Sequence, residues 1–202
     1  MVMGRQAAGF LGLVFALAGG VADAGGMLPA PVAARAQVQA SEFDIEGYRA
    51  TRFRAPVTRP PAPAARIALA DALQLDPGRD ALFIDVLPVE SGVRDPGSGA
   101  WRISSEHWTI PGARWHPEIG RSPPDPVLWQ GLRKAIAAAR EARPDMPVVL
   151  FCRADCWMGW NAARRLAREG VPHVLWLAEG IEGWHEAGRT LIRADPEVIA
   201  AP

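Results

Sequence analysis

Cysteine and lysine are both scarce in this chain of 202 residues, which has two cysteines, Cys152 and Cys156, and a single lysine, Lys134. The other basic residues are all arginine, so the shortage of lysine is a composition effect that carries no functional information. The shortage of cysteine is more informative. Both thiols lie in one short stretch, so any thiol or disulfide chemistry of this chain is expected there.

Other absences exclude whole classes of partner. Acidic and basic side chains balance at 22 each, so no net charge favours a polyanion, and we expect no nucleic acid partner. The histidines show no metal-ligand spacing, and a zinc site at the cysteines would need distant ligands, so we predict no metal. The sequence has neither a glycine-rich phosphate loop nor a serine nucleophile elbow.

One long apolar run is present, at the start of the chain. Residues 1–24 contain one positive charge at Arg5, an apolar core of about 15 residues and small-residue exits at 16–18 and 22–24. Its glycines make the run weak as a membrane anchor. We therefore predict a cleaved signal peptide and a mature protein without a membrane span, located in the periplasm, where disulfides persist.

After the signal, the composition predicts one domain preceded by an extension. Apolar residues make up 49% of the chain, enough for the core of one domain. Residues 25–66 read as a Pro/Ala-rich linker and N-terminal arm, loose over 25–41 and docked and mostly extended over 42–60. The folded domain is expected over 67–195, followed by a C-terminal tail over 196–202. The apolar residues that predict docking of the arm are Phe43, Ile45, Tyr48 and Phe53.

Apolar periodicity predicts strands that alternate with helices. This order favours an α/β fold in which a parallel sheet has helices on both faces. Asp125 is the predicted N-cap of one helix, with Pro126 at its first position. The segment between residues 87 and 108 is expected to be a long loop. The predicted strands are 81–86, 148–151 and 173–177, with a short one within 109–115, and the predicted helices are 67–75, 126–142, 161–169 and 181–188.

The chain is organised around residues 147–170. The buried strand 148–151 stops at Cys152, a loop follows, and Asn161 is predicted to cap the next helix, which Gly170 ends. In parallel sheets, ligands bind at the carboxyl ends of the strands. Cys152 and Asp85 both lie at such ends. We interpret Asp85 as a structural group that accepts hydrogen bonds from a loop.

The spacing of the two cysteines allows a disulfide if the loop curls. So small a ring contributes little stability on the chain-entropy model, and short, strained disulfides are often reducible, which favours a redox pair. An inert bridge in a secreted domain is the alternative. In the redox interpretation Cys152 is the nucleophile, its thiolate favoured by loop amides and the helix N-terminus, and Cys156 resolves the intermediate. The charge of Asp155 opposes this effect.

The candidate site extends along the loop on both sides of the second cysteine. Trp157, at the mouth of the loop, is predicted to contact a planar ligand or a partner. The catalytic candidates are Cys152 and Cys156; the loop residues are Arg153, Ala154, Asp155, Trp157, Met158 and Gly159; the supporting residues are Asp85, Trp160 and Asn161.

Four ordered motifs resemble those of a rhodanese-like domain. They are IDV at 84–86, TIPGA at 109–113, VVLFC at 148–152 and EGIEGWHEAG at 179–188. The resemblance implies a rhodanese-like parallel sheet flanked by helices on both faces, with an extended N-terminal arm. It also implies that Cys152 occupies the position of the thiol that carries a persulfide in sulfurtransferases.

A closer resemblance covers nearly the whole mature chain. The segments CRADCWMGWNAA at 152–163, GYR at 47–49, RAPV at 54–57 and IDVLP at 84–88 resemble a family of exported proteins associated with pyrroloquinoline-quinone (PQQ)-dependent alcohol catabolism and described by a CXXCW motif. Here the spacing is CxxxCW. Sulfurtransferases usually place an arginine five residues after the cysteine, where this chain has Trp157, a departure that argues against thiosulfate chemistry.

Together these features predict a periplasmic rhodanese-like protein. Its Cys152/Cys156 loop would perform thiol–disulfide or sulfur-transfer chemistry on a small sulfur or thiol substrate, in support of PQQ-dependent alcohol oxidation. The alternative is a non-catalytic binding module for a quinone redox cofactor, PQQ, or for a periplasmic dehydrogenase or cytochrome partner. Both the alcohol-oxidation role and the PQQ association are implied by the resemblance.

Overall fold

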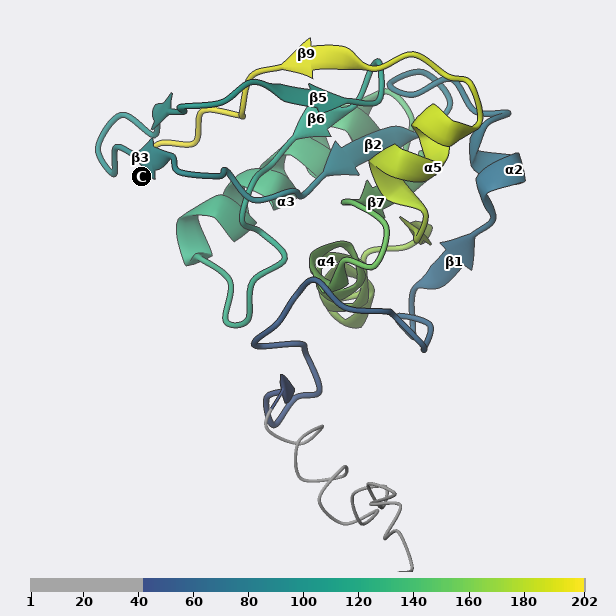
Figure 1. Cartoon of the computed structure of the whole chain (residues 1–202), viewed down its shortest axis with the longest axis horizontal. Coiled ribbons are helices and arrows are strands. Elements are labelled where there is room, and N and C mark those ends of the chain that lie inside the picture. The colour runs from purple at the N-terminus through teal and green to yellow at the C-terminus, as the bar shows by residue number, and fades with distance from the viewer. Residues whose placement is uncertain (1–41, 202) are drawn as a thin grey trace, which may run out of the picture.

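A computed structural model describes residues 42–201, and Figure 1 shows them as a twisted sheet between helices. The predicted signal peptide and the predicted loose segment, residues 1–24 and 25–41, lie outside the described residues. The five-stranded sheet has the order β1-β8-β7-β2-β6, and every neighbouring pair is parallel. Its strands are β1 (Ala65–Ile67), β2 (Leu82–Asp85), β6 (Arg114–Trp115), β7 (Val148–Phe151) and β8 (Val174–Leu177).

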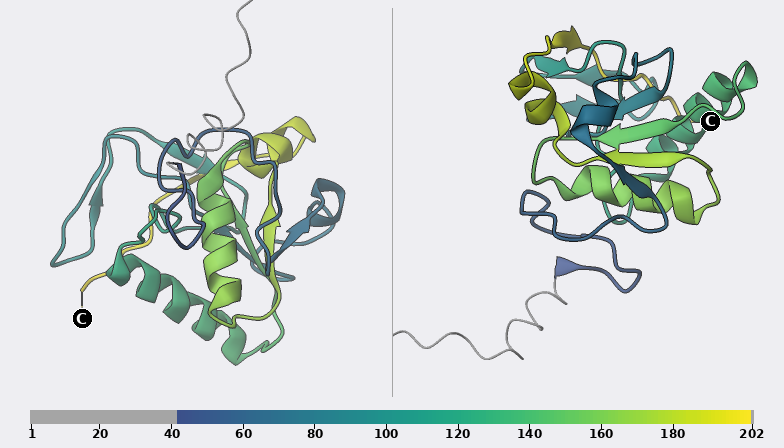
Figure 2. Two further views of the ribbon diagram at one scale, coloured as in Figure 1. Left: turned by 90° about the horizontal axis from the view of Figure 1, so that it is seen from below. Right: turned by 90° about the vertical axis from the view of Figure 1, so that its right-hand side faces the viewer.

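Helices cover both faces of this sheet, which confirms the predicted α/β architecture. The helices are α2 (Leu69–Ala72), α3 (Pro126–Glu141), α4 (Trp157–Arg168) and α5 (Gly180–Glu186). Side chains alternate along a strand, so Val148 and Leu150 of β7 share one core with α3 and α4. Val149 and Phe151 share the other core with α2 and α5. Figure 2 shows both layers from two further sides.

Local sequence signals explain where α3 begins. The side chain of Asp125 accepts hydrogen bonds from the backbone N–H groups of Val127, at 2.8 Å, and Leu128, at 3.1 Å. Pro126 occupies the first turn, where a missing N–H costs nothing. The predicted cap and the predicted start of this helix are confirmed.

Two predicted elements are wrong in extent. The helix expected over 67–75 is reduced to α2, because Ile67 instead pairs with Leu177 as the last residue of β1. The segment expected to be a long loop contains the antiparallel pair β3 (Val93–Arg94) and β4 (Trp101–Arg102). It also contains the start of β5 (His107–Thr109), which pairs with β9 (Ile192–Ala194).

The N-terminal arm, residues 42–60, lies along α4 on the side that faces away from the sheet (Figures 1 and 2). Its extended stretches make only isolated bridges, between Phe43 and Arg49 and between Arg54 and Cys156. Tyr48 is buried at 3% exposure and belongs to the core on the α3 and α4 side. The arm is therefore docked through Tyr48, Phe43 and Phe53, as predicted, and it reaches the cysteine loop. The prediction was wrong for Ile45, whose side chain is fully exposed.

Candidate active site

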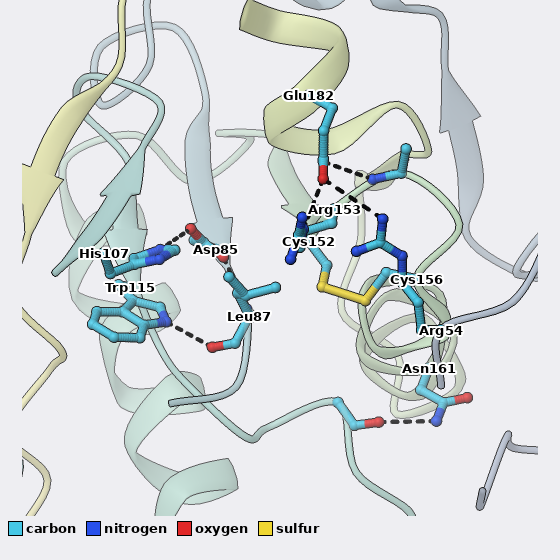
Figure 3. The surroundings of a disulfide bond; sticks show 12 residues. Arg54, Asp85, Leu87, His107, Trp115, Cys152, Arg153, Cys156, Asn161 and Glu182 are labelled. Atoms are coloured by element: carbon cyan, nitrogen blue, oxygen red, sulfur yellow. Dashed lines mark hydrogen bonds and ion pairs between the residues drawn. A yellow bond between two sulfur atoms is a disulfide. The ribbon is translucent and has the colours of Figure 1, made fainter. Parts of the chain in front are cut away.

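Cys152 and Cys156 form a disulfide at the carboxyl end of β7 (Figure 3). Cys152 directly follows the strand, Cys156 is the N-cap of α4, and their Cα atoms are 6.1 Å apart, within the usual range for a disulfide. Asp155 takes a left-handed backbone conformation with φ 53°, which turns the chain back so that the two sulfurs meet. The sequence prediction that this loop can curl into a bonded pair is confirmed.

The helix after the disulfide begins earlier than predicted. Asn161 was expected to cap it, but α4 already begins at Trp157, and Cys156 caps it without a side-chain hydrogen bond. The first turn of α4 therefore follows directly on the second cysteine. Its amide groups and the positive end of its dipole adjoin the disulfide, which favours a thiolate when the bond is open.

Asn161 anchors the arm. It is completely buried, and its side chain accepts the backbone N–H of Arg49 at 2.9 Å while donating to the carbonyl oxygens of Arg49 at 2.8 Å and Gly120 at 2.9 Å. One side chain thus ties the arm and the loop before α3 to the middle of α4. An asparagine in mid-helix is explained by these tertiary hydrogen bonds and not by capping.

Both cysteines are buried, Cys152 at 1% and Cys156 at 6% exposure. The arm supplies part of the cover, because the backbone N–H of Ala55 donates to Asp155 O at 2.9 Å and that of Trp157 donates to Phe53 O at 2.8 Å. From α5, the backbone N–H of Ile181 donates to Cys152 O at 3.0 Å. Cys152, which the sequence analysis assigned as the nucleophile, is therefore covered in this structure.

Arg153 and Ala154 are held by one carboxylate of α5. Arg153 Nε donates to Glu182 Oε1 at 2.7 Å, and the backbone N–H of Ala154 donates to Glu182 Oε2 at 2.9 Å. Burial raises the pKa of Glu182, but the hydrogen bonds from Arg153 and Ala154 outweigh it, so the pKa lies below its ordinary value. Glu182 also lies 3.9 Å from Arg54 Nη2 of the arm, so this one carboxylate is shared by two arginines, with the closer contact to Arg153 (Figure 3).

Trp157 is more buried than its position at the loop predicted. At 3% exposure it packs edge-on against Phe43 of the arm, with ring centroids 5.1 Å apart, and against Trp160, at 5.2 Å. Arg49 and Arg59 of the arm lie over its ring, at 5.3 and 5.6 Å from the centroid. The predicted face for a stacked planar ligand is thus covered by the arm.

The next two loop residues pack inward. Met158 is 1% exposed and belongs to the core on the α3 and α4 side. A Cβ on Gly159 would lie 3.3 Å from the backbone carbon of Phe151 and 3.4 Å from the backbone nitrogen of Cys152. Gly159 thus allows the start of α4 to lie against β7 and the cysteine.

Asp85 is the hydrogen-bond acceptor that the sequence predicted. Completely buried at the end of β2, it accepts from the Leu87 backbone N–H at 2.8 Å and from Thr109 Oγ1 at 2.6 Å, and it lies 2.7 Å from His107 Nε2. His107 also stacks on Trp115, with centroids 4.0 Å apart.

The sequence analysis missed His107. The available signal was strand alternation, which puts residues 107 and 109 on the same face of β5 and so directs both toward Asp85. Asp85 and Phe151 are register partners in neighbouring strands. Asp85 and its partner His107 therefore lie beside Cys152 at the carboxyl ends of the parallel strands (Figure 3).

The described residues, 42–201, contain neither a candidate metal site nor a candidate membrane-spanning helix. Within that range no three His, Cys, Asp or Glu side chains are grouped so as to hold a metal ion. None of the helices in the same range has the length and apolar character that a membrane crossing requires.

Comparison with known proteins identifies the fold family. The profile described as a rhodanese-like domain matches residues 70–187, more than half of the chain. A search of curated proteins returns no match. The matched segment contains β2, β7 and α4, and hence Asp85 and both cysteines. With its parallel sheet and its cysteine at the end of β7, this chain belongs to the rhodanese-like domain family.

Proposed function

We propose that the Cys152–Cys156 pair carries out thiol–disulfide exchange with a small thiol or disulfide substrate. A rhodanese-like domain indicates chemistry of the sulfur-transfer or redox type. The observation that carries the proposal is the bonded pair itself, placed between the end of β7 and the first turn of α4. A five-residue ring contributes little stability as a staple, so the bond is better explained by reactivity.

The proposed cycle starts from the reduced pair. The Cys152 thiolate attacks one sulfur of a substrate disulfide, a mixed disulfide forms, and the other substrate sulfur leaves as a thiolate. Cys156 then loses its proton and attacks the Cys152 sulfur, which forms the intramolecular disulfide and releases the second substrate thiolate. Two electrons pass from the cysteine pair to the substrate, and a dithiol substrate would reverse every step.

The contacts around the loop favour exchange over transfer of sulfur from an anionic donor such as thiosulfate. Trp157 occupies the position where sulfurtransferases usually place an arginine, and its ring is buried beneath the arm. Arg153, the nearest cation along the chain, is paired with Glu182. An anionic donor would therefore meet no unpaired arginine of the loop itself.

The cellular role that we propose follows from the family resemblance. We propose that the protein acts in the periplasm after signal cleavage and supports PQQ-dependent alcohol oxidation. A second candidate function is a non-catalytic binding module for a quinone redox cofactor, or for a dehydrogenase or cytochrome partner. The burial of both sulfurs favours this second candidate, because an inert bridge would need no access.

A redox titration separates the two candidates. A pair that cycles should have a reduction potential well above roughly −300 mV, whereas an inert structural bridge should lie below that value. The measurement is thiol labelling of the full chain, equilibrated in thiol buffers of defined potential, followed by mass spectrometry. A potential below that threshold would contradict the exchange proposal.

Serine variants then test the two roles. Cys156→Ser should accumulate a mixed disulfide at Cys152 when it meets a substrate disulfide, because the resolving thiol is missing. Cys152→Ser, the matched control, should accumulate much less, although it also retains one thiol. Equal trapping by both variants would contradict the assignment of Cys152 as the nucleophile. A circular dichroism spectrum like that of the parent protein verifies the fold of each variant.

A further inference from the structure

A cavity of about 630 Å³ is lined by residues of the arm and by Trp157 at the start of α4. Its polar lining consists chiefly of Glu42 and three arginines, Arg49, Arg52 and Arg59. Sites for small organic molecules usually measure about 300 to 1,000 Å³, and a single inorganic ion needs far less. The volume therefore suits a small organic molecule.

The charged lining has an excess of two positive charges, from three arginines and one glutamate. Glu42 is shared, because it pairs with Arg49 at 2.6 Å and with Arg52 at 2.9 Å. Arg59 has no carboxylate partner within residues 42–201. Burial, with the charges of Arg164 and Arg49, lowers the pKa of Arg59, as expected for a cation without a counter-ion.

Two of the three guanidinium groups are already held in position by aromatic rings. Arg59 lies 4.2 Å from the ring centroid of Phe43, and Arg49 lies 5.1 Å from the same centroid. A guanidinium that stacks by its face keeps its N–H edges available for bidentate bonds to a carboxylate. The donors of Arg49 are used by Glu42 and by backbone carbonyls. Arg52 contacts Glu42 through Nη1, so Arg59 and the remaining N–H groups of Arg52 can bind a ligand.

An unsatisfied donor lies in the same wall. Trp157 lines the cavity at 3% exposure, and its indole Nε1 is buried without a hydrogen-bond partner among the described residues. Leaving such a group unpaired costs roughly 1 to 3 kcal/mol. Because this Nε1 is itself buried, a ligand oxygen accepts its N–H, and so removes the cost, only when the arm shifts to admit it.

We propose that this cavity binds a small organic anion with at least two carboxylates, with Arg52 and Arg59 as its ligands. The apolar part of the lining, which includes Phe43, Ala55 and Pro56, suits a short carbon skeleton between the acid groups. The chain's own N-terminal segment is a poor occupant, because residues 1–41 contain one acidic residue, Asp23. The site does not depend on turnover of the cysteine pair.

The test is isothermal titration of the full oxidised chain with benzene-1,3,5-tricarboxylate, followed by benzoate, benzamide and inorganic phosphate. The tricarboxylate should bind one per chain and at least tenfold more tightly than any of the other three. Arg59→Gln and Arg52→Gln should each weaken it at least fivefold, and Trp157→Phe, which keeps a ring but loses the N–H, should weaken it several-fold. Glu42→Gln should tighten it, because the only negative charge of the lining is removed.

The matched control is Arg193→Gln, which removes an exposed arginine that pairs with Glu106 elsewhere on the surface. It should leave the affinity unchanged. The proposal is overturned if no probe binds at millimolar concentration, if phosphate or benzoate binds as tightly as the tricarboxylate, or if Arg193→Gln weakens binding as much as Arg59→Gln. Unfolding midpoints, measured for every variant, identify and exclude any that does not fold.

Discussion

The backbone N–H of Trp157 donates to the carbonyl oxygen of Phe53 at 2.8 Å, which joins the first turn of α4 to an arm that lies about a hundred residues earlier in the chain. Together with the neighbouring bond from Ala55 to Asp155, it closes the arm over the disulfide. Exchange with a substrate therefore requires the arm to move, so the stability of the arm contacts should control the rate at which the disulfide reacts.

Ala55→Pro should speed reduction of the disulfide by a small thiol. Proline has no N–H, so the 2.9 Å bond to Asp155 O is lost, and one such bond contributes about 1 kcal/mol, or roughly fivefold in the open population. Thiol release under a fixed concentration of dithiothreitol measures the rate. The control is Thr58→Pro, at an exposed arm position whose amide makes no hydrogen bond within residues 42–201. Equal acceleration by both variants would contradict the proposed cover.

Asn161→Ala should destabilise the whole protein. The side chain makes three buried hydrogen bonds, two of them to the backbone of Arg49, and its loss leaves those groups unpaired. We expect the free energy of unfolding to fall by roughly 3 kcal/mol, measured by urea titration. Gln130→Ala on the exposed face of α3 should change it by less than about 0.5 kcal/mol. A similar small effect at Asn161 would show that the arm is not anchored there.

Gly180→Ala should be more costly than Gly170→Ala. Both glycines have a positive φ, 57° and 84°, so an alanine is strained at either position by about 1 to 2 kcal/mol. Only at position 180 would the new Cβ also lie 2.3 Å from the carbonyl oxygen of Cys152, because position 170 has open space. We expect a loss of roughly 3 kcal/mol or more at 180 in urea unfolding. Equal losses would mean that α5 can move away from the cysteine loop at no cost.

His116 should make the protein sensitive to mild acid. It is 1% exposed and neither ring nitrogen has a hydrogen-bond partner within the described residues, so burial lowers its pKa from 6.5 to about 4. Between these values the unfolded chain binds a proton that the folded protein does not bind. The free energy of unfolding should therefore fall by roughly 3 kcal/mol as the pH drops through this window, with no further loss from this group below it.

His116→Gln, which cannot take up this proton, should flatten that part of the pH profile in urea titrations at pH 7, 5 and 4. His185→Gln, which replaces an exposed histidine of α5, is the matched control and should keep the parent slope. If the parent slope persists in His116→Gln, the acid sensitivity comes from another group. Glu197 and Arg114, the charged groups that shift the pKa of His116 in opposite directions, are intact in both variants.

Sequence patterns a few residues long correctly predicted those helices and strands whose position depends only on adjacent residues. The apolar run that ends at Cys152 is β7, and Asp125 with Pro126 begins α3, because strand burial and helix capping are decided within a few residues. The start of α4 was misplaced for the same reason. Asn161 is a good capping residue, but its side chain is engaged by the arm, and a cysteine caps the helix instead.

The sequence alone determined the alternation of strands and helices, the parallel sheet, and the presence of both cysteines in one loop after a buried strand, since these follow from apolar periodicity and position along the chain. Only the tertiary structure decided that the sulfurs lie beneath the arm, that His107 meets Asp85, and that the arm's arginines surround Trp157. The hydrogen bonds of the arm join residues as far apart as 122 positions, and no local pattern records such pairings, because they arise only when the whole chain packs around its core.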